Sequence, residues 1–135
     1  MTTETWTPDS SLSPQDKLID QNFLKTIAEK LEENGHLDIS CMVTPQEKEK
    51  NRTMMQLSEK EWTPTLENIS NSNIIALIKF FTLAEKEFSG WQGNEKSPVI
   101  YLAKALRRRG ETLDKDLLHW IKANSDNKFL PYGPL

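Results

Sequence analysis

Two segments of the chain carry the same helix-start signal, and this signal constrains the fold more than any other feature. Ser13-Pro14-Gln15-Asp16 and Thr44-Pro45-Gln46-Glu47 each place a hydroxyl before a proline and a carboxylate two residues after it. The hydroxyl accepts a hydrogen bond from an unpaired backbone N–H, proline loses no bond at the first helical position, and the carboxylate favours the positive end of the helix dipole. Ser97-Pro98 repeats the first half of the signal. A chain with these starts is expected to be helical.

Apolar residues recur at helical spacing after these starts and in two further segments. The expected helices run from Pro14 to about Asn34, from Pro45 to about Lys60, from Asn73 to about Phe88, from Pro98 to Arg109 and from about Leu113 to Ala123. The 73–88 segment is apolar around most of its circumference, which is typical of a central helix surrounded by others. The sequence therefore predicts an all-α fold, a compact single domain of about five helices.

The segments between the expected helices are predicted to be connectors. Apolar residues alternate between 37 and 43, but a lone strand has no sheet to join, so we expect an extended connector there. Pro64 and several Asn and Ser residues interrupt the pattern over 61–72, which predicts a linker whose Trp62 packs on the core. The domain is expected to cover 13–135, after a flexible N-terminal segment at 1–12.

The last eight residues, KFLPYGPL, are unusually apolar for a chain end. Pro131 and Pro134 disfavour a helix there, and Gly133 suits a turn, so an extended, bent tail is expected. Phe129, Leu130 and Tyr132 would be its anchors. Two interpretations follow: a lid packed on the protein's own domain, or a docking peptide for a partner. We expect the lid.

Composition narrows the setting in which the protein works. The chain is 36% hydrophobic and 27% charged with a net charge of −3, and no apolar run approaches the ~20 residues of a membrane helix. The N-terminus lacks the basic and apolar regions of a secretory signal. A single cysteine excludes an internal disulfide framework and suits a reducing compartment. We expect a cytoplasmic, bacterial protein without a membrane partner.

Residues that support catalysis or metal binding are scarce. The two histidines, His36 and His119, and the single cysteine, Cys41, stand in no ligand motif. Cys41 lies among apolar neighbours, which indicates a buried, inert thiol. Phosphate-binding glycine loops are absent. The sequence thus predicts no metal, no cofactor and no catalytic residue, so an enzyme is not expected.

Two groups of side chains are candidates for partner binding. Arg107, Arg108 and Arg109, with Lys104 nearby, form the one basic run. They could contact phosphate, although a pI near 5.4 favours a solvated helix end stabilised by its dipole. The second group is aromatic: it comprises Trp91, Tyr101 and Trp120, and in the tail Phe129 and Tyr132. The aromatic side chains could line a ligand groove or pack in the core.

These observations favour a small non-enzymatic helical protein that acts as an adaptor or regulator through protein–protein binding. One alternative is a nucleic-acid-binding regulator that uses the helices near 98–123. Another is a sulfur-relay-like accessory protein of an enzyme.

The sulfur-relay alternative follows from a resemblance. The segments IIALIKFFTLAEKEF, SPVIYLAKALRRRG, LLHWI and LPYGPL resemble the second half of the DsrC/TusE sulfur-relay family over residues 74–135. That family has an aromatic-rich helix, a proline-led helix with a Leu-x-Lys-Ala core and an aromatic-Pro-x-Gly-Pro turn. Here Leu130, not an aromatic residue, precedes Pro131. Family members continue into an arm whose terminal cysteine carries the sulfur, whereas this sequence ends at Leu135 and its cysteine is Cys41.

Overall fold

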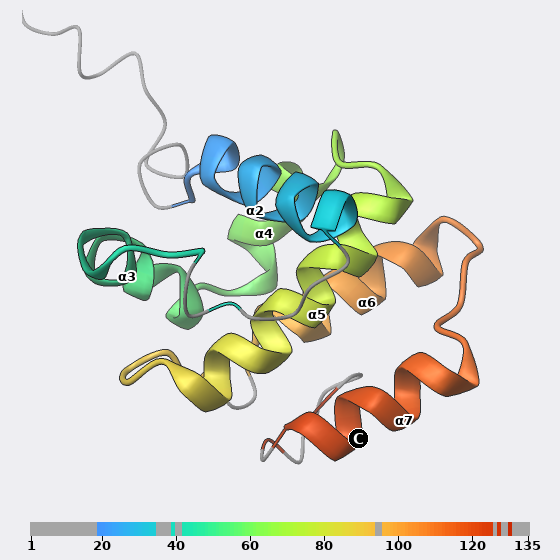
Figure 1. The fold of residues 1–135 in the computed structure, drawn as a ribbon. Coiled ribbons are helices and arrows are strands. Elements are labelled where there is room, and N and C mark those ends of the chain that lie inside the picture. Colours follow the sequence, from blue (N-terminus) through green and yellow to red (C-terminus); the bar gives the residue numbers. More distant parts are fainter. Residues whose placement is uncertain are drawn as a thin grey trace, which may run out of the picture.

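The computed structural model describes residues 19–34, 39, 42–93, 96–125, 127 and 130 (Figure 1). Within these residues the secondary structure is entirely helical. The elements are α2 (Gln21–Asn34), α3 (Pro45–Asn51), the 3-10 helix η4 (Arg52–Gln56), α4 (Glu59–Leu66), α5 (Asn71–Glu87), α6 (Pro98–Arg108) and α7 (Lys115–Asn124). The expected all-α fold is confirmed.

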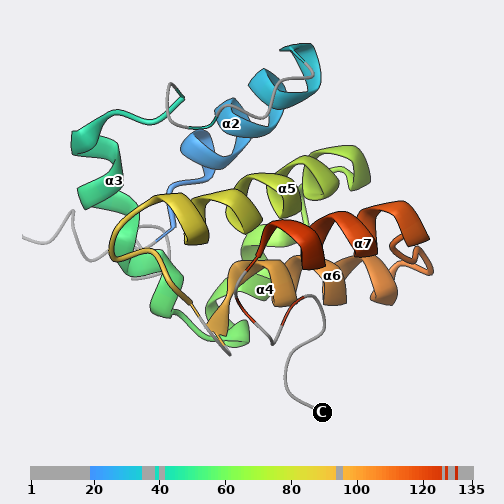
Figure 2. The same cartoon turned by 60° about the horizontal axis from the view of Figure 1, so that its bottom comes forward.

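Helix α5 lies at the centre of the domain, as its apolar circumference predicts. It packs against α2 on one side and against α6 and α7 on the other, while α4 packs against α6. Figures 1 and 2 show that α5, α6 and α7 run in alternating directions, because short connections join each helix to its neighbour. The helices α2 and α7 therefore lie on opposite sides of α5.

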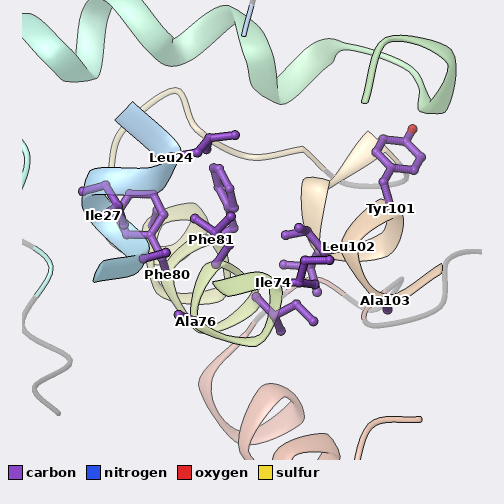
Figure 3. Packing of buried hydrophobic residues seen from close by; sticks show 14 of the residues in the cluster. Leu24, Ile27, Ile74, Ala76, Phe80, Phe81, Tyr101, Leu102 and Ala103 are labelled. Atoms are coloured by element: carbon purple, nitrogen blue, oxygen red, sulfur yellow. The ribbon is translucent and has the colours of Figure 1, made fainter. Parts of the chain in front are cut away.

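The core is built around the two adjacent phenylalanines of α5. Phe80 and Phe81 are fully buried, and Figure 3 shows them beside Leu24 and Ile27 of α2. Their rings contact each other edge to face with centroids 5.0 Å apart. Burying a large apolar side chain contributes about 1.5–3 kcal/mol to folding, so the packing of these two phenylalanines against α2 is a principal source of stability.

The prediction of one continuous helix from Pro45 to about Lys60 is wrong, because the structure forms three shorter helices in this region. α3 ends at Asn51, η4 follows, and α4 begins at Glu59. Ser58 and Glu61 form a second capping box, in which the Ser58 N–H donates to Glu61 Oε2 at 3.2 Å. The Ser-x-x-Glu pattern is itself a helix-start signal. It was missed because the charged residues 59–61 also fit the continuation of a solvated helix.

The expected linker at 61–72 is wrong in its first half, since α4 extends to Leu66 with Pro64 inside it. Proline removes one hydrogen bond, the one that would run to the Lys60 carbonyl oxygen. Trp62 is fully buried, as predicted, and its Nε1–H donates to the Met54 carbonyl oxygen at 3.3 Å.

Capping side chains set the observed helix starts. α2 begins at Gln21 and not at Pro14, because Ile19 and Asp20 are not helical and Asp20 Oδ1 accepts from the Phe23 N–H at 3.1 Å. The remaining expected starts are correct to within two residues. At α3 the predicted cap is confirmed: Thr44 Oγ1 accepts from the Glu47 N–H at 3.1 Å.

Some predictions lie partly or wholly outside the described residues. These are the N-terminal segment at 1–12, Cys41, His36, and the tail residues Phe129 and Tyr132. In the 37–43 connector, Ile39 and Val43 are buried and neither belongs to a strand. At the start of the tail, Leu130 is buried in the core. Among the helices that the structure describes, none has the length and apolarity to cross a membrane.

Candidate functional site

The three arginines at the end of α6 point to different surroundings, because successive helical residues are rotated by about 100°. Arg109 crosses to the end of α4 and the loop after it. Its guanidinium donates to the carbonyl oxygens of Leu66 and Ile69, each at 2.7 Å, and to Asn71 Oδ1 at 2.8 Å. Carbonyls at the end of a helix lack intrahelical partners and carry the negative end of the dipole. Arg109 is therefore a cross-link within the fold.

Lys104 and Arg108 share one carboxylate, Glu59 at the start of α4. Their distances to Glu59 are 3.2 Å and 3.4 Å, and all three side chains are partly exposed. With Arg107 the two cations line a shallow hollow of about 340 Å³. Because Glu59 offsets part of the charge and Arg109 is engaged elsewhere, the basic run is a weaker phosphate site than its sequence suggests.

We expect Arg109→Ala to lower the free energy of unfolding by about 1–3 kcal/mol, since it removes the donor of three hydrogen bonds to Leu66, Ile69 and Asn71. The matched control is Arg108→Ala, which removes an exposed ion pair and should cost no more than about 1 kcal/mol. Urea denaturation followed by circular dichroism measures both. Equal losses in the two variants would contradict the cross-link.

The aromatic candidates separate into core and surface. Trp91 is fully buried and Tyr101 is 7% exposed, so both belong to the core cluster, at whose edge Figure 3 shows Tyr101. The Trp91 Nε1–H donates to the Lys48 carbonyl oxygen at 3.1 Å. Trp120 is only partly buried. Of the three aromatic candidates that the structure describes, Trp120 alone keeps a surface that a partner can contact.

Trp120 lines an open groove between α5 and α7, which we call the α5–α7 groove. Its volume is about 440 Å³, and most of its lining is apolar. The lining residues are Ile75, Lys79, Thr112, Leu113, Asp114, Asp116, Leu117 and Trp120. Ile75 is 36% exposed and is the one large hydrophobic side chain exposed among the described residues. Sequence reasoning missed Ile75, because it lies beside the main apolar stripe of α5, where the pattern does not separate buried from exposed positions.

Glu85 is a second feature that sequence reasoning missed. It lies on α5, is 6% exposed, and accepts hydrogen bonds from the Ser97 hydroxyl, from the Gly93 N–H at 3.1 Å and from Asn127 Nδ2 at 3.3 Å. Burial raises the pKa of the Glu85 carboxyl above its ordinary value, and these hydrogen bonds oppose part of the rise. Among the described residues no cation forms an ion pair with it.

Glu85 therefore holds together α5, the start of α6 and the segment after α7. Gly93 permits the close approach, since a Cβ there would lie 2.8 Å from Ser97 Cα. Its position could have indicated burial. Glu85 follows Phe81 by four positions, so it lies on the apolar face of α5. Its three donors come from this same chain, which is the arrangement of a structural carboxylate.

Within the part of the chain that the structure describes, no three His, Cys, Asp or Glu side chains gather as metal ligands do. No family model, curated protein or solved structure matches the chain. The resemblance of residues 74–135 to the DsrC/TusE family therefore stays a prediction.

Proposed function

We propose that this chain is a non-enzymatic helical adaptor or regulator that binds a segment of another protein in the α5–α7 groove. The observation that supports this most is the exposed Ile75 beside the partly exposed Trp120. Burying such side chains on binding contributes about 1.5–3 kcal/mol each when the burial is complete. Tryptophan is also among the residues that most often dominate binding energy at protein interfaces.

The charges around the groove indicate which partner suits it. Asp114 and Asp116 are exposed at the start of α7, and Lys79 is partly buried across from them on α5. The lining thus carries two carboxylates against one ammonium group. A partner segment that presents an apolar side chain next to a lysine or arginine is complementary to this lining.

The other two functions receive less support from the geometry. For nucleic acid, the basic run is divided between Glu59 and the carbonyl oxygens near the end of α4. For sulfur relay, the chain's single cysteine, Cys41, stands far upstream of the 74–135 segment that resembles the family. Neither function has a described site comparable to the α5–α7 groove.

Site-specific photo-crosslinking in cells tests the proposal. A photoreactive amino acid at position 75 or 120 should cross-link to the same partner, and mass spectrometry should place the cross-link in an apolar segment with adjacent Lys or Arg. The control position is the exposed Glu32 on α2, on the opposite side of α5 (Figure 1). In a binding assay with that segment, Trp120→Ala should weaken affinity at least about tenfold. Cross-links at positions 75 and 120 only to a second copy of this chain, or equally at all three positions, would contradict the proposal.

A further inference from the structure

A second, smaller concavity lies on the α2 side of α5, away from the α5–α7 groove. We call it the amide cleft, because four amide side chains line it. Its volume is about 210 Å³. The lining residues are Gln21, Asn22, Asn68 and Asn73, with Lys25, Thr65 and the apolar Leu24, Ala28, Ile69 and Leu77. The cleft thus combines an apolar floor with a polar rim drawn from α2, α5 and the end of α4.

Thr65 is the unusual member of this lining. It is 5% exposed, yet its hydroxyl makes no hydrogen bond to any residue that the structure describes. Two other helical threonines bind the carbonyl oxygen four residues before them: Thr63 at 2.9 Å and Thr82 at 2.7 Å. A buried hydroxyl without a partner is destabilising, and native proteins rarely keep one unless water or a ligand satisfies it. The Thr65 hydroxyl is therefore available to a group inside the cleft.

The amides of the rim are available too. Within the described residues, the side chains of Gln21, Asn22, Asn68 and Asn73 form no hydrogen bond to one another or to other groups. Each amide carries one acceptor oxygen and a donor NH₂ group. The oxygen and the NH₂ group of one amide can form two hydrogen bonds to a ring edge that has a donor next to an acceptor. Asn and Gln bind the edge of adenine in this way.

The rest of the lining narrows the class of ligand. One lysine is too little for a free phosphate. Ile69 is partly exposed in this lining and offers an apolar surface to a flat ring. We infer that the amide cleft binds a small planar heterocycle of the nucleobase class, with its face on Ile69 and its edge on Thr65 and the amides. The exposed Lys25 can pair with one negative charge on a substituent of the ring that extends toward solvent.

Titration of the ¹⁵N-labelled full chain with adenine, hypoxanthine, cytosine and uracil tests this inference. At least one base should shift the backbone resonances of Thr65 and Asn68 and the side-chain NH₂ resonances of Asn68 and Asn73. The shifts should saturate, and the residues of the α5–α7 groove should not respond. If no base moves these resonances at millimolar concentration, or if the shifts spread over the whole surface, the inference is overturned.

Thr65→Val separates a ligand contact from a structural role. It preserves shape and removes only the hydroxyl, so the variant should fold with an equal or higher melting temperature and bind the selected base about five- to tenfold more weakly. Asn68→Ala, at an exposed position, should weaken binding similarly. Thr63→Val, which removes a hydroxyl bound within α4, should leave affinity unchanged. A lower melting temperature in Thr65→Val with unchanged affinity would show that the hydroxyl serves the fold.

Discussion

Replacing Trp91 with alanine should lower the free energy of unfolding by about 3–5 kcal/mol, a large part of the total stability of a small domain. The indole is fully buried. Its ring contacts Phe80, Phe81 and Phe88 with centroids 5.2–6.4 Å apart. The variant loses these contacts, leaves a cavity and removes the donor to the Lys48 carbonyl oxygen.

The matched control for Trp91 is Trp120, which is only partly buried. Trp120→Ala should cost no more than about 1.5 kcal/mol, because less apolar surface is returned to water. Guanidinium denaturation of both variants, followed by far-ultraviolet circular dichroism, gives the comparison. Similar losses would mean that Trp91 does not hold the loop after α5 onto the core.

Glu85→Ala should cost about 2–4 kcal/mol, because it leaves the buried Ser97 hydroxyl and the Gly93 N–H without an acceptor. The control is Glu87→Ala, an exposed position near the end of the same helix. It should change the free energy of unfolding by about 0.5 kcal/mol or less. An equal effect of both substitutions would argue against a buried anchor at Glu85.

The pH dependence of Glu85 has a defined sign. Burial raises the pKa of this carboxyl above its ordinary value of 4.5, so the folded state holds the proton more tightly than the unfolded state. The stability that protonation contributes is complete below pH 4.5 and is lost as the pH rises through the folded pKa. Glu85→Gln stays neutral, so its stability relative to the natural protein should increase over that window. Urea midpoints measured from pH 4 to pH 8 check this, and a constant difference would contradict it.

The starts of α3 and α6 could be predicted from the sequence because capping is local. Thr44 with Glu47, and Ser97 with Pro98, act within a few residues of one another, and the structure keeps both starts. The break after Asn51 was harder to predict because it depends on burial, which is a long-range property. Asn51, Met54 and Met55 are buried against the rest of the domain, and this packing favours a turn over a continuous helix.

The candidate sites could be predicted only in part. Trp91 and Trp120 are the same residue type near helix ends, and only the packing of distant segments decides that the first is buried and the second is not. The three arginines form a uniform run in the sequence, yet rotation around the helix gives Arg109 a structural role that Arg108 lacks. The residues that line the amide cleft come from three separate segments of the sequence, so no local sequence pattern predicts the cleft.

The polar contacts between α4 and the end of α6 also determine the order in which parts of the chain can fold during synthesis. With eight residues, α4 is too short to persist alone in water. Its polar partners, Lys104, Arg108 and Arg109, lie 43–49 residues later than Glu59 and Leu66. Because the ribosome makes the N-terminal part first, α4 cannot form these polar contacts until α6 has been synthesised. Thr65 and Asn68 should then reach their final places only after α6 has been synthesised, so a nascent chain that stops before α6 would carry α2 and α5 without a finished cleft.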